Sequence, residues 1–406
     1  MTDMWLLAAL WFGLALIATL LSSWFRIATA LSEIVVGTAA SLIIGTLFSQ
    51  SAMGLNEPWI KFLAGTGAIM LTFLAGAEID PDVFKLKWKE ALGIGLASFF
   101  APFLGCTAVA YYLIHWDPRA SWLAGVALST TSVAVVYAVM LEYGLNKTEF
   151  GKTVLAACFI TDRGTVVALG LIFSPFTMKT IIFVAVSFCA VLFLPFLTPR
   201  IFARYGGRPS ELEAKYLLLF LFTLGALATW ADSEAVLPAY VIGMVLAGTV
   251  GRDHALVRRL RTLALGFLTP IYFIRAGSFV SLPALVMAPA VFVILLLGKM
   301  ATKLVAVYPA TRFFRIPGKE GMYTTLLMST GLTFGSISAL FGLSHGIIDV
   351  SQYSFLVAAV VASAVVPTII ANTFYLPRHL FPAPRGKGSV LTTTEATSPA
   401  AEGGVQ

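Results

Sequence analysis

Apolar windows of about 20 residues recur along the whole chain, and this recurrence constrains the fold more than any other feature. An α-helix of that length crosses the hydrocarbon core of a bilayer. The chain has 406 residues, of which 58% are hydrophobic and only 12% are charged, whereas a soluble domain has a charged fraction of roughly 25%. The sequence therefore predicts an all-α polytopic membrane protein and argues against a soluble fold.

These windows predict thirteen transmembrane helices. The predicted spans cover about 4–22, 28–48, 59–78, 91–115, 120–142, 150–173, 178–199, 214–231, 235–250, 262–281, 286–308, 320–342 and 352–376. No basic residue precedes the first span, so we expect a retained helix rather than a cleaved signal peptide. After about Gly386 the composition is that of a disordered tail. We therefore predict one membrane domain over 1–385 and a disordered cytoplasmic tail over 386–406.

The distribution of basic residues predicts the orientation of the chain. With thirteen spans, 20 of the 27 Lys and Arg residues fall on one side of the membrane, 3 fall on the other and 4 lie inside spans. Such an excess marks the cytoplasmic side of a membrane protein. We therefore expect the N-terminus outside and the C-terminus in the cytoplasm. The net charge of +7 then orients the chain in membrane lipid, and no binding of nucleic acid is predicted.

Three pairs of stretches resemble each other at a shift of about 200 residues. The pairs are "SEIVVGTAASLIIG" from Ser32 with "SEAVLPAYVIGMVLAG" from Ser233, "FLAGAEID" from Phe73 with "FIRAGSFVS" from Phe273, and "LSTTSVAVV" from Leu128 with "MSTGLTFGS" from Met328. They match spans 1–6 with spans 8–13, and matched helices run in opposite directions because seven spans separate them. This predicts an inverted-topology repeat, as in many secondary transporters, with repeat one over 4–173, a connector helix over 178–199 and repeat two over 214–376.

The third pair places hydroxyl and glycine residues in the middle of two spans. The two clusters are Ser129, Thr130, Thr131 and Ser132, and Ser329, Thr330, Gly331 and Thr333. Such clusters can satisfy an interrupted helix backbone at membrane depth. In the repeat geometry two broken helices would cross near the midplane, where their ends offer partial charges and free carbonyls to an ion. The alternative is close packing of unbroken helices through small residues.

Asp162 lies near the middle of the sixth span, in the stretch "FITDRGTVV". A charge at the bilayer centre costs roughly 2.5–3.5 kcal/mol on insertion scales, so this residue requires an explanation. Removal from water favours the protonated carboxyl group, whereas a small cation can stabilise the ionised form. A site that holds either a proton or a metal ion is the minimal chemistry of cation/proton exchange. The alternative is a structural ion pair with a lysine or arginine.

Two lysines are candidates to compensate the charge of Asp162. Lys299 and Lys303 lie four residues apart in the eleventh span, and therefore on one face of its helix. Either could neutralise Asp162 across the bundle. For Lys299 the alternative is a contact with local backbone or water.

Two arginines also lie inside spans. Arg163 follows Asp162 directly, and neighbouring residues point about 100° apart on a helix, so we expect Arg163 to pair elsewhere, with an acid such as Glu33 or Glu78. Arg275 lies near the outer end of the tenth span, where its side chain could extend to the membrane surface.

These stretches resemble the monovalent cation:proton antiporter superfamily, in its bacterial sodium- or potassium-proton branch, from about Ser32 to Val366. The first looks like the glycine-rich second helix of that family, and "LTFLAGAEID" is similar to its F-x-x-G-x-E-x-D helix end. The stretch "ALSTTSVAVVYAVMLEYGLNKTEFGKTVLAACFITD" resembles its broken helix and the acidic helix that follows, and "PIYFIRAGSFVSL" looks like its F-F-x-x-x-G segment. The lysine or arginine of the family's eleventh helix falls on Lys303.

The resemblance implies a core domain with crossed broken helices beside a dimerisation domain, and alternating access by movement of the core. It implies a homodimer in the bacterial inner membrane and a role in pH homeostasis. It also implies that Asp162 binds the transported Na⁺ or K⁺ and H⁺ in turn, with Thr130 and Thr131 lining the site.

The chain departs from the family pattern beside this aspartate. Family members commonly carry Asp-Asp, Asn-Asp or Gln-Asp there, whereas this chain has Thr161 before Asp162. The usual acidic partner of the lysine is thus absent, so we expect Lys303 to turn to Asp162 directly. A single carboxylate favours electroneutral one-for-one exchange.

Two other classes of function stay open. An anion transporter or proton-coupled solute transporter would use Arg163 or Arg275, which are unusual at their matched positions, and a membrane sensor or scaffold would show no flux. No enzyme activity is expected, because the four histidines fall at span ends or in loops without metal or triad spacing to Asp162. No cofactor is expected, and the one metal expected is the transported monovalent cation at Asp162.

Overall fold

The computed structural model of this chain describes residues 2–25, 27–47, 52–77, 87–145, 148–173, 177–207, 210–231 and 236–381. Within these ranges the regular structure is entirely helical, which confirms the predicted fold class. The helices before residue 231 are α1 (Thr2–Phe25), α2 (Thr29–Leu47), α3 (Pro58–Ala77), α5 (Trp88–Ala108), η1 (Val109–Leu113), α6 (Pro118–Ser129), α7 (Val133–Glu142), α8 (Glu149–Phe173), α9 (Met178–Tyr205) and α10 (Leu212–Trp230). The predicted tail over 386–406 lies outside the described residues.

The remaining helices carry the second set of matched stretches. They are α11 (Val236–Leu246), η3 (Ala247–Gly251), α12 (His254–Leu263), η4 (Ala264–Leu268), α13 (Thr269–Ser278), α14 (Leu282–Met287), α15 (Pro289–Phe313), α16 (Gly318–Met328), α17 (Thr333–Ser344), α18 (Val350–Ile370), η5 (Ala371–Tyr375) and η6 (Arg378–Leu380). Of these, α12, α14 and η6 were not predicted.

Each of the thirteen predicted spans coincides with one helix or with two consecutive helices. In the described ranges, ten helical segments are long and apolar enough to cross a membrane, by length and composition. Consecutive helices are joined in this count, so that α16 and α17 form the single segment Gly318–Ser344. Three predicted spans are not among them. One is interrupted between α6 and α7, the second is the shorter apolar helix Pro238–Gly251, and the third is divided into η4 and α13. The count of thirteen crossings stays a prediction.

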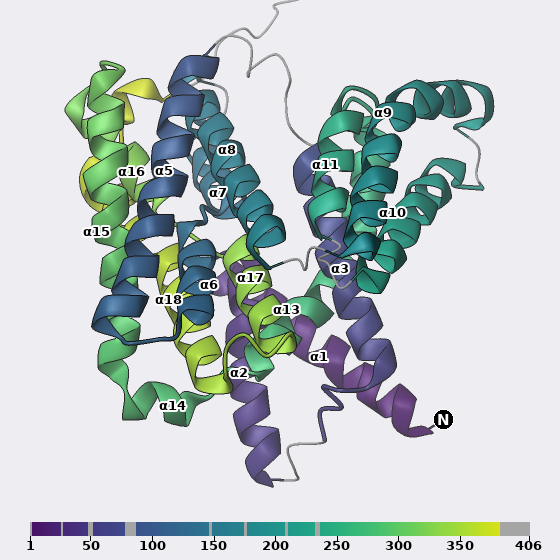
Figure 1. Cartoon of the computed structure of the whole chain (residues 1–406), viewed down its shortest axis with the longest axis horizontal. Coiled ribbons are helices and arrows are strands. Elements are labelled where there is room, and N and C mark those ends of the chain that lie inside the picture. The colour runs from purple at the N-terminus through teal and green to yellow at the C-terminus, as the bar shows by residue number, and fades with distance from the viewer. Residues whose placement is uncertain are drawn as a thin grey trace, which may run out of the picture.

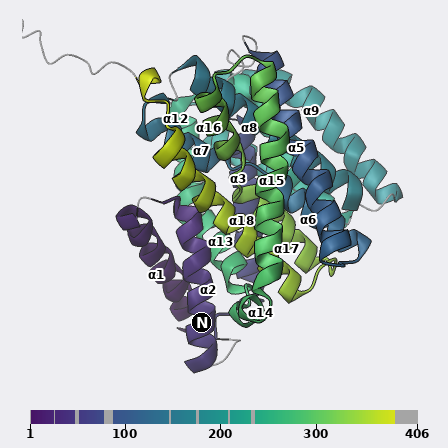
Figure 2. The ribbon, with the colours of Figure 1, turned by 90° about the vertical axis from the view of Figure 1, so that its left-hand side faces the viewer.

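The helices form two bundles that stand side by side (Figure 1). We call α5 to α8 with α15 to α18 the first bundle, and α3 with α9 to α12 the second bundle. Helices α1, α2 and α13 lie across the lower part of the view, where α13 packs on both α2 and α3. In the first bundle, α15 runs between α5 and α18 and packs on both (Figure 2). The residues predicted to bind the ion or to compensate its charge all lie in the first bundle, whereas Arg275 lies in α13.

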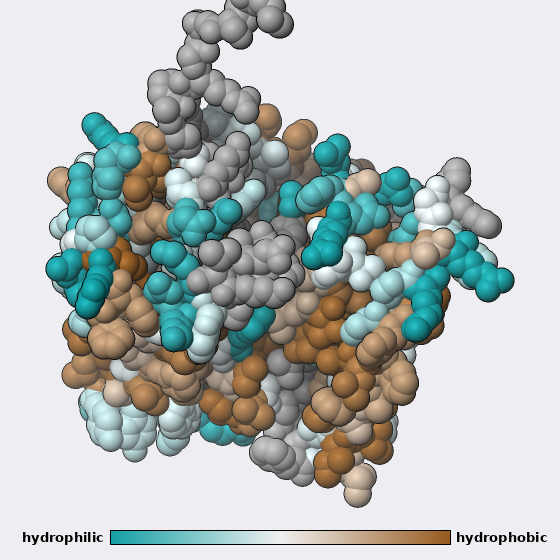
Figure 3. All heavy atoms as spheres, turned by 90° about the horizontal axis from the view of Figure 1, so that it is seen from above, coloured by the Kyte–Doolittle hydropathy of each residue, from teal (hydrophilic) through white to brown (hydrophobic). Residues whose placement is uncertain are grey.

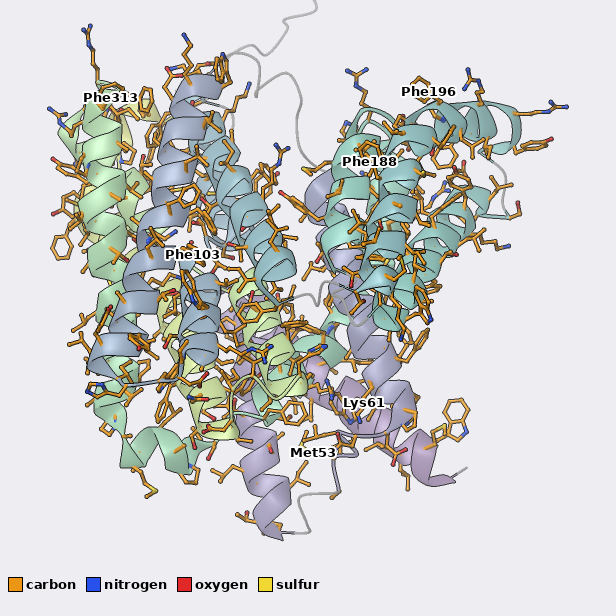
Figure 4. All side chains as sticks on the ribbon, in the orientation of Figure 1. Met53, Lys61, Phe103, Phe188, Phe196 and Phe313 are labelled. Carbon is orange, nitrogen blue, oxygen red and sulfur yellow. The ribbon has the colours of Figure 1, made fainter. Side chains whose placement is uncertain are left out.

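Polar and apolar surfaces separate along the long direction of the helices. Side chains with nitrogen atoms gather at the upper end in Figure 4, where Phe313 and Phe196 lie, and Lys61 lies toward the lower end. Seen from above, hydrophilic side chains gather over much of the upper end, and hydrophobic side chains show mainly in the lower half of the view (Figure 3). Lys61 was predicted on the side with few basic residues, so the arrangement agrees with that assignment. Which end faces the cytoplasm stays a prediction.

Glycines let two pairs of helices pack backbone against backbone. In the contact between α3 and α11, a Cβ added to Gly243 would overlap the carbonyl oxygen of Phe73. In the contact between α2 and α13, a Cβ added to Gly37 would overlap the carbonyl oxygen of Ile274. The matched stretches make α2 the counterpart of α11 and α13 the counterpart of α3, so these two contacts are also counterparts. An inverted repeat would produce this arrangement, although the repeat itself stays a prediction.

We expect Gly243→Ala to destabilise the protein. The new Cβ overlaps a backbone oxygen, which cannot swing aside as a flexible side chain can, so α11 must move away from α3. Overpacking of this kind typically costs about 1–3 kcal/mol. Gly248→Ala in the following π-helical turn is the matched control, because nothing lies within 4 Å of its added Cβ. Thermal unfolding in detergent should show a lower midpoint for the first variant only, and equal midpoints would contradict the close packing.

Candidate functional site

The first broken helix is interrupted between α6 and α7. The helix ends at Ser129 and begins again at Val133, with Thr130 in an extended conformation (φ −60°, ψ 153°). Two hydroxyls of the cluster bind carbonyls that the break leaves without a helical partner. Ser129 Oγ donates to Val126 O at 2.8 Å, and Thr130 Oγ1 donates to Ala127 O at 3.0 Å. The hydroxyl cluster therefore satisfies an interrupted backbone, as predicted.

The second broken helix is interrupted between α16 and α17, where two hydroxyls bind carbonyls that also accept backbone N–H groups. Ser329 Oγ donates to Thr325 O at 2.8 Å, and Thr330 Oγ1 donates to Leu327 O at 2.7 Å. Thr333 begins the second half of the helix. Both predicted clusters therefore mark helix breaks, and close packing of unbroken helices is excluded.

The two breaks are hydrogen-bonded to each other. The Ser132 backbone N–H donates to Thr330 O at 3.2 Å, and Thr131 Oγ1 donates to Met328 O at 2.8 Å. These residues are at most 2% exposed, so the bonds lie in the interior of the first bundle. The broken helices thus cross, and four half-helix ends meet at one place.

Asp162 faces this crossing from α8. Residues 158, 162 and 165 lie on one stripe of the helix because they are four and three residues apart. At one end of the stripe, Cys158 Sγ lies 3.5 Å from Met328 Sδ at the second break. At the other end, Thr165 Oγ1 lies 3.3 Å from Ser129 Oγ at the first break. Asp162 is therefore placed between contacts to the two breaks.

The Asp162 carboxyl group is 2% exposed, and its Oδ1 atom accepts no hydrogen bond from the described residues. A buried oxygen without a protein partner is rare in native structures and leaves a place for a water, a proton or an ion. Thr161, the preceding residue, is fully buried and turns toward α5, where its Oγ1 lies 3.3 Å from Gly95 O. The carboxyl group thus has an oxygen that is free to accept a hydrogen bond or bind a cation.

Lys303 joins the first break to α5. Its Nζ donates to Ser98 Oγ at 2.7 Å, to Ser129 O at 2.9 Å and to Thr131 Oγ1 at 3.0 Å. An ammonium group has three donors, so these bonds use all of them. The expected direct pair with Asp162 is replaced by this arrangement, in which the lysine charge acts on Asp162 through space. The C-terminal end of α6 binds the ammonium group because the free carbonyls of a helix C-terminus carry partial negative charge.

Lys299 approaches the second break one turn away on α15. Its Nζ is fully buried and donates to Ser363 Oγ of α18 at 3.0 Å. A Cβ added to Gly331 would overlap that Nζ, so the ammonium group lies where the glycine leaves room. The two lysines therefore lie at different breaks, and the partner of Lys299 is a side-chain hydroxyl on another helix, which is neither Asp162 nor the local backbone or water contact weighed as the alternative.

Arg163 has a partner in the second bundle. Its guanidinium group lies within hydrogen-bonding reach of the Tyr240 hydroxyl on α11. Of the two acids expected as partners, Glu33 is buried in α2, and Glu78 lies outside the described residues. Tyr240 is thus a partner that the sequence did not indicate.

Arg275, near one end of α13, contacts neighbouring protein groups. Its Nε donates to Leu55 O at 3.0 Å, and the guanidinium carbon lies 4.9 Å from the centre of the Phe279 ring. These contacts bind Arg275 to the loop before α3. They explain why an arginine lies here, and no bound ligand is needed.

Four residues near the site were missed by the sequence analysis: Ser98, Thr165, Tyr240 and Ser363. One signal was available, because Thr165 lies three residues after Asp162 and so shares its face. The other three lie far from Asp162 in sequence on helices rich in small and apolar residues, where a single hydroxyl does not stand out.

The structure is thus that of a polytopic membrane protein with two crossed broken helices and a buried carboxyl group beside their crossing. The family model described as sodium/hydrogen exchanger, transmembrane, matches residues 12–375. The chain belongs to this family, which is a family of membrane transporters.

Two relatives with known names are similar to this chain at low sequence identity. The chain is 24% identical over 350 residues to probable Na⁺/H⁺ antiporter 3 of Methanocaldococcus jannaschii, covering 82% of this chain and 88% of the relative. It is 25% identical over 369 residues to cation/H⁺ antiporter 18 of Arabidopsis thaliana, covering 83% of this chain but only 46% of that longer protein. The solved structure of the sodium proton antiporter MjNhaP1 from Methanocaldococcus jannaschii at pH 8 is similar in fold. Its TM-score is 0.69 at 14% identity, with 91% of this chain and 96% of that chain covered.

Proposed function

We propose that this protein is a secondary-active antiporter that exchanges a monovalent cation, Na⁺ or K⁺, for H⁺, with Asp162 binding the two in turn. The observation that carries the proposal is the buried Asp162 carboxyl group, whose Oδ1 has no hydrogen-bond partner among the described residues. A proton on the carboxyl group or a cation beside the carboxylate would each satisfy this oxygen. Because one group serves both ligands, binding of one displaces the other, which couples their movements.

The crossed breaks supply the surroundings that such a site needs. Unwound backbone and half-helix ends near the midplane provide carbonyls and partial charges for ions in transporters of this build. In this proposal Thr130, Thr131 and Thr161 line the site. Lys303 keeps positive charge near Asp162 without binding its oxygens. Lys299, one helical turn from Lys303 on α15, supplies a second positive charge.

Alternating access would come from movement of the first bundle, which holds the site, against the second bundle. The predicted homodimer, the bacterial inner membrane and a role in pH homeostasis belong to the same proposal. The names of the two relatives, both cation/proton antiporters, support the exchange but do not select Na⁺ over K⁺.

One observation favours a second candidate, an anion transporter or proton-coupled solute transporter. Lys299 and Lys303 are both fully buried, so among the described residues two ammonium groups accompany the one carboxyl group, Asp162, beside the crossing. An anion could balance that excess. Arg163 and Arg275 weigh less toward this candidate, because each has a protein partner.

The experiment that tests the proposal uses purified protein in liposomes that contain a pH-sensitive dye. We expect Na⁺, K⁺ or Li⁺ added as gluconate salts to change the internal pH as strongly as the chloride salts do. A clamped membrane potential should leave the rate unchanged if one proton moves for each cation. A response to chloride or bicarbonate that does not depend on the cation would instead support the anion transporter, and a folded protein without any flux would support the sensor or scaffold.

A further inference from the structure

The backbone of Tyr240 packs within the second bundle, and its side chain contacts the first bundle. A Cβ added to Gly76 of α3 would overlap the carbonyl oxygen of Tyr240, so the backbone of α11 is pressed against α3 at this residue. The side chain is 1% exposed and extends into the first bundle. There its ring meets the Phe334 ring of α17 edge-on, with centroids 6.0 Å apart and an angle of 83° between the planes.

The Tyr240 hydroxyl holds the turn of α8 that carries Asp162. It donates to Phe159 O at 3.3 Å, and the Arg163 guanidinium group lies within its hydrogen-bonding reach. Phe159 and Arg163 are four residues apart and share one face of α8. A tyrosine hydroxyl has one donor and two lone pairs, so it can donate to the carbonyl and accept from the guanidinium group together.

These polar groups lie at the boundary of the two bundles, where apolar packing alone would not require them. A buried tyrosine hydroxyl needs a partner, and an arginine at this depth is expensive. Phenylalanine would give the same edge-on contact with Phe334. By contrast, the hydroxyl of Tyr323 on α16 bonds Asn372 Oδ1 at 3.2 Å within one bundle, so it cannot link the two.

We propose that Tyr240 and Arg163 form a latch between the bundles that closes in one state of the transport cycle and opens in the other. The inference rests on the proposed function, because movement of one bundle against the other separates α8 from α11. Tyr240 is a positioning residue in this scheme: it acts on the Asp162 turn through α8 and touches neither ion. Arg163 then links the site-bearing helix to the second bundle and binds no substrate anion.

The latch predicts a specific kinetic change in Tyr240→Phe. The variant keeps the ring and removes the hydroxyl, so it destabilises only the latched state. The apparent affinity for a ligand scales with the population of the state that binds it, and the two states open to opposite faces. The half-saturating cation concentration should therefore rise on one face of the membrane and fall on the other, and the ratio of the two concentrations should change by about 3- to 10-fold, the range for loss of one hydrogen bond.

The experiment compares wild type, Tyr240→Phe, Arg163→Gln and the double variant in liposomes of known protein orientation. The two single changes remove the same contact, so the double variant should differ little from either. Tyr323→Phe is the matched control, and its half-saturating concentrations should stay unchanged. A lower maximal rate with the same half-saturating concentrations on both faces would mean a merely structural role and would overturn the latch.

A second measurement does not depend on transport. Cys158 precedes Phe159, and both Cys158 and Cys106 of α5 are fully buried. We expect Tyr240→Phe to raise the rate at which a small maleimide labels Cys158, with labelling of Cys106 unchanged as the internal control. Equal labelling of Cys158 in wild type and Tyr240→Phe would overturn the latch. Absence of cation/proton exchange in wild type would instead overturn the proposed function, while the labelling result still decides whether the latch exists.

Discussion

Asp162→Asn is expected to reduce cation-driven proton movement to the level of protein-free liposomes while the protein stays folded. The amide has nearly the size of the carboxyl group, so packing at this fully enclosed position is kept. It neither ionises nor takes up a proton near neutral pH, so it can hold neither ligand of the proposed exchange. The measurement is the dye response to Na⁺ and K⁺ gradients, together with thermal unfolding of the same preparation.

Asp117→Asn is the matched control for this change. Asp117 caps the N-terminus of α6, where its Oδ2 accepts from Arg119 N and Ala120 N at 3.1 Å. Asparagine caps helices about as well as aspartate, so this variant loses a carboxylate away from the crossing and should keep its exchange activity. Exchange retained in Asp162→Asn would disprove the proposed role of Asp162. Loss in both variants would show that the assay responds to charge in general.

Lys303→Met is expected to be the most destabilising of the substitutions considered. Methionine fills a similar volume but leaves Ser129 O and two buried hydroxyls without the ammonium group that joins them. It also leaves Asp162 without the nearest buried positive charge. Removal of one partner from a buried charged arrangement costs about 3–5 kcal/mol. Thermal unfolding followed by tryptophan fluorescence should therefore show a clearly lower midpoint than in wild type.

Two further variants separate this explanation from a general intolerance of α15. Lys299→Met removes an equally buried lysine that makes one hydrogen bond, so its midpoint should fall less. The double variant Asp162→Asn with Lys303→Met removes both charges, and it should recover part of the stability that Lys303→Met loses. Equal losses for the two lysine variants would contradict the assigned roles, as would a double variant less stable than Lys303→Met.

The sequence indicated the elements and the residue at the centre of the site. Hydrophobic length alone located every long helix of the described ranges, because a bilayer-crossing segment must be apolar over about 20 residues. The two hydroxyl and glycine clusters predicted the breaks, since their side chains satisfy carbonyls that leave the helix. Asp162 was conspicuous because an acid in an apolar run is costly. Each of these signals is local in the chain and needs no knowledge of neighbouring helices.

Some local elements were missed because a stronger pattern concealed them. Helix α12 is short and basic, and Asp253 Oδ1 caps it by accepting from Ala255 N at 3.1 Å and Leu256 N at 3.0 Å. It stands between long apolar segments, so its arginines were interpreted as loop charges that set orientation. The capping aspartate was the available signal.

The partners of the charged groups were decided by the tertiary structure alone. The sequence placed Lys299 and Lys303 on one face and predicted that either could neutralise Asp162, but a helix face does not determine which atoms lie across from it. The fold brought a carbonyl and two hydroxyls from α5 and the first break to Lys303, and it brought Tyr240 to Arg163. Apolar periodicity carries no information about which helices pack together, because lipid and a neighbouring helix favour the same residues. Sequence therefore determined where the costly groups lie, and helix packing determined what each of them binds.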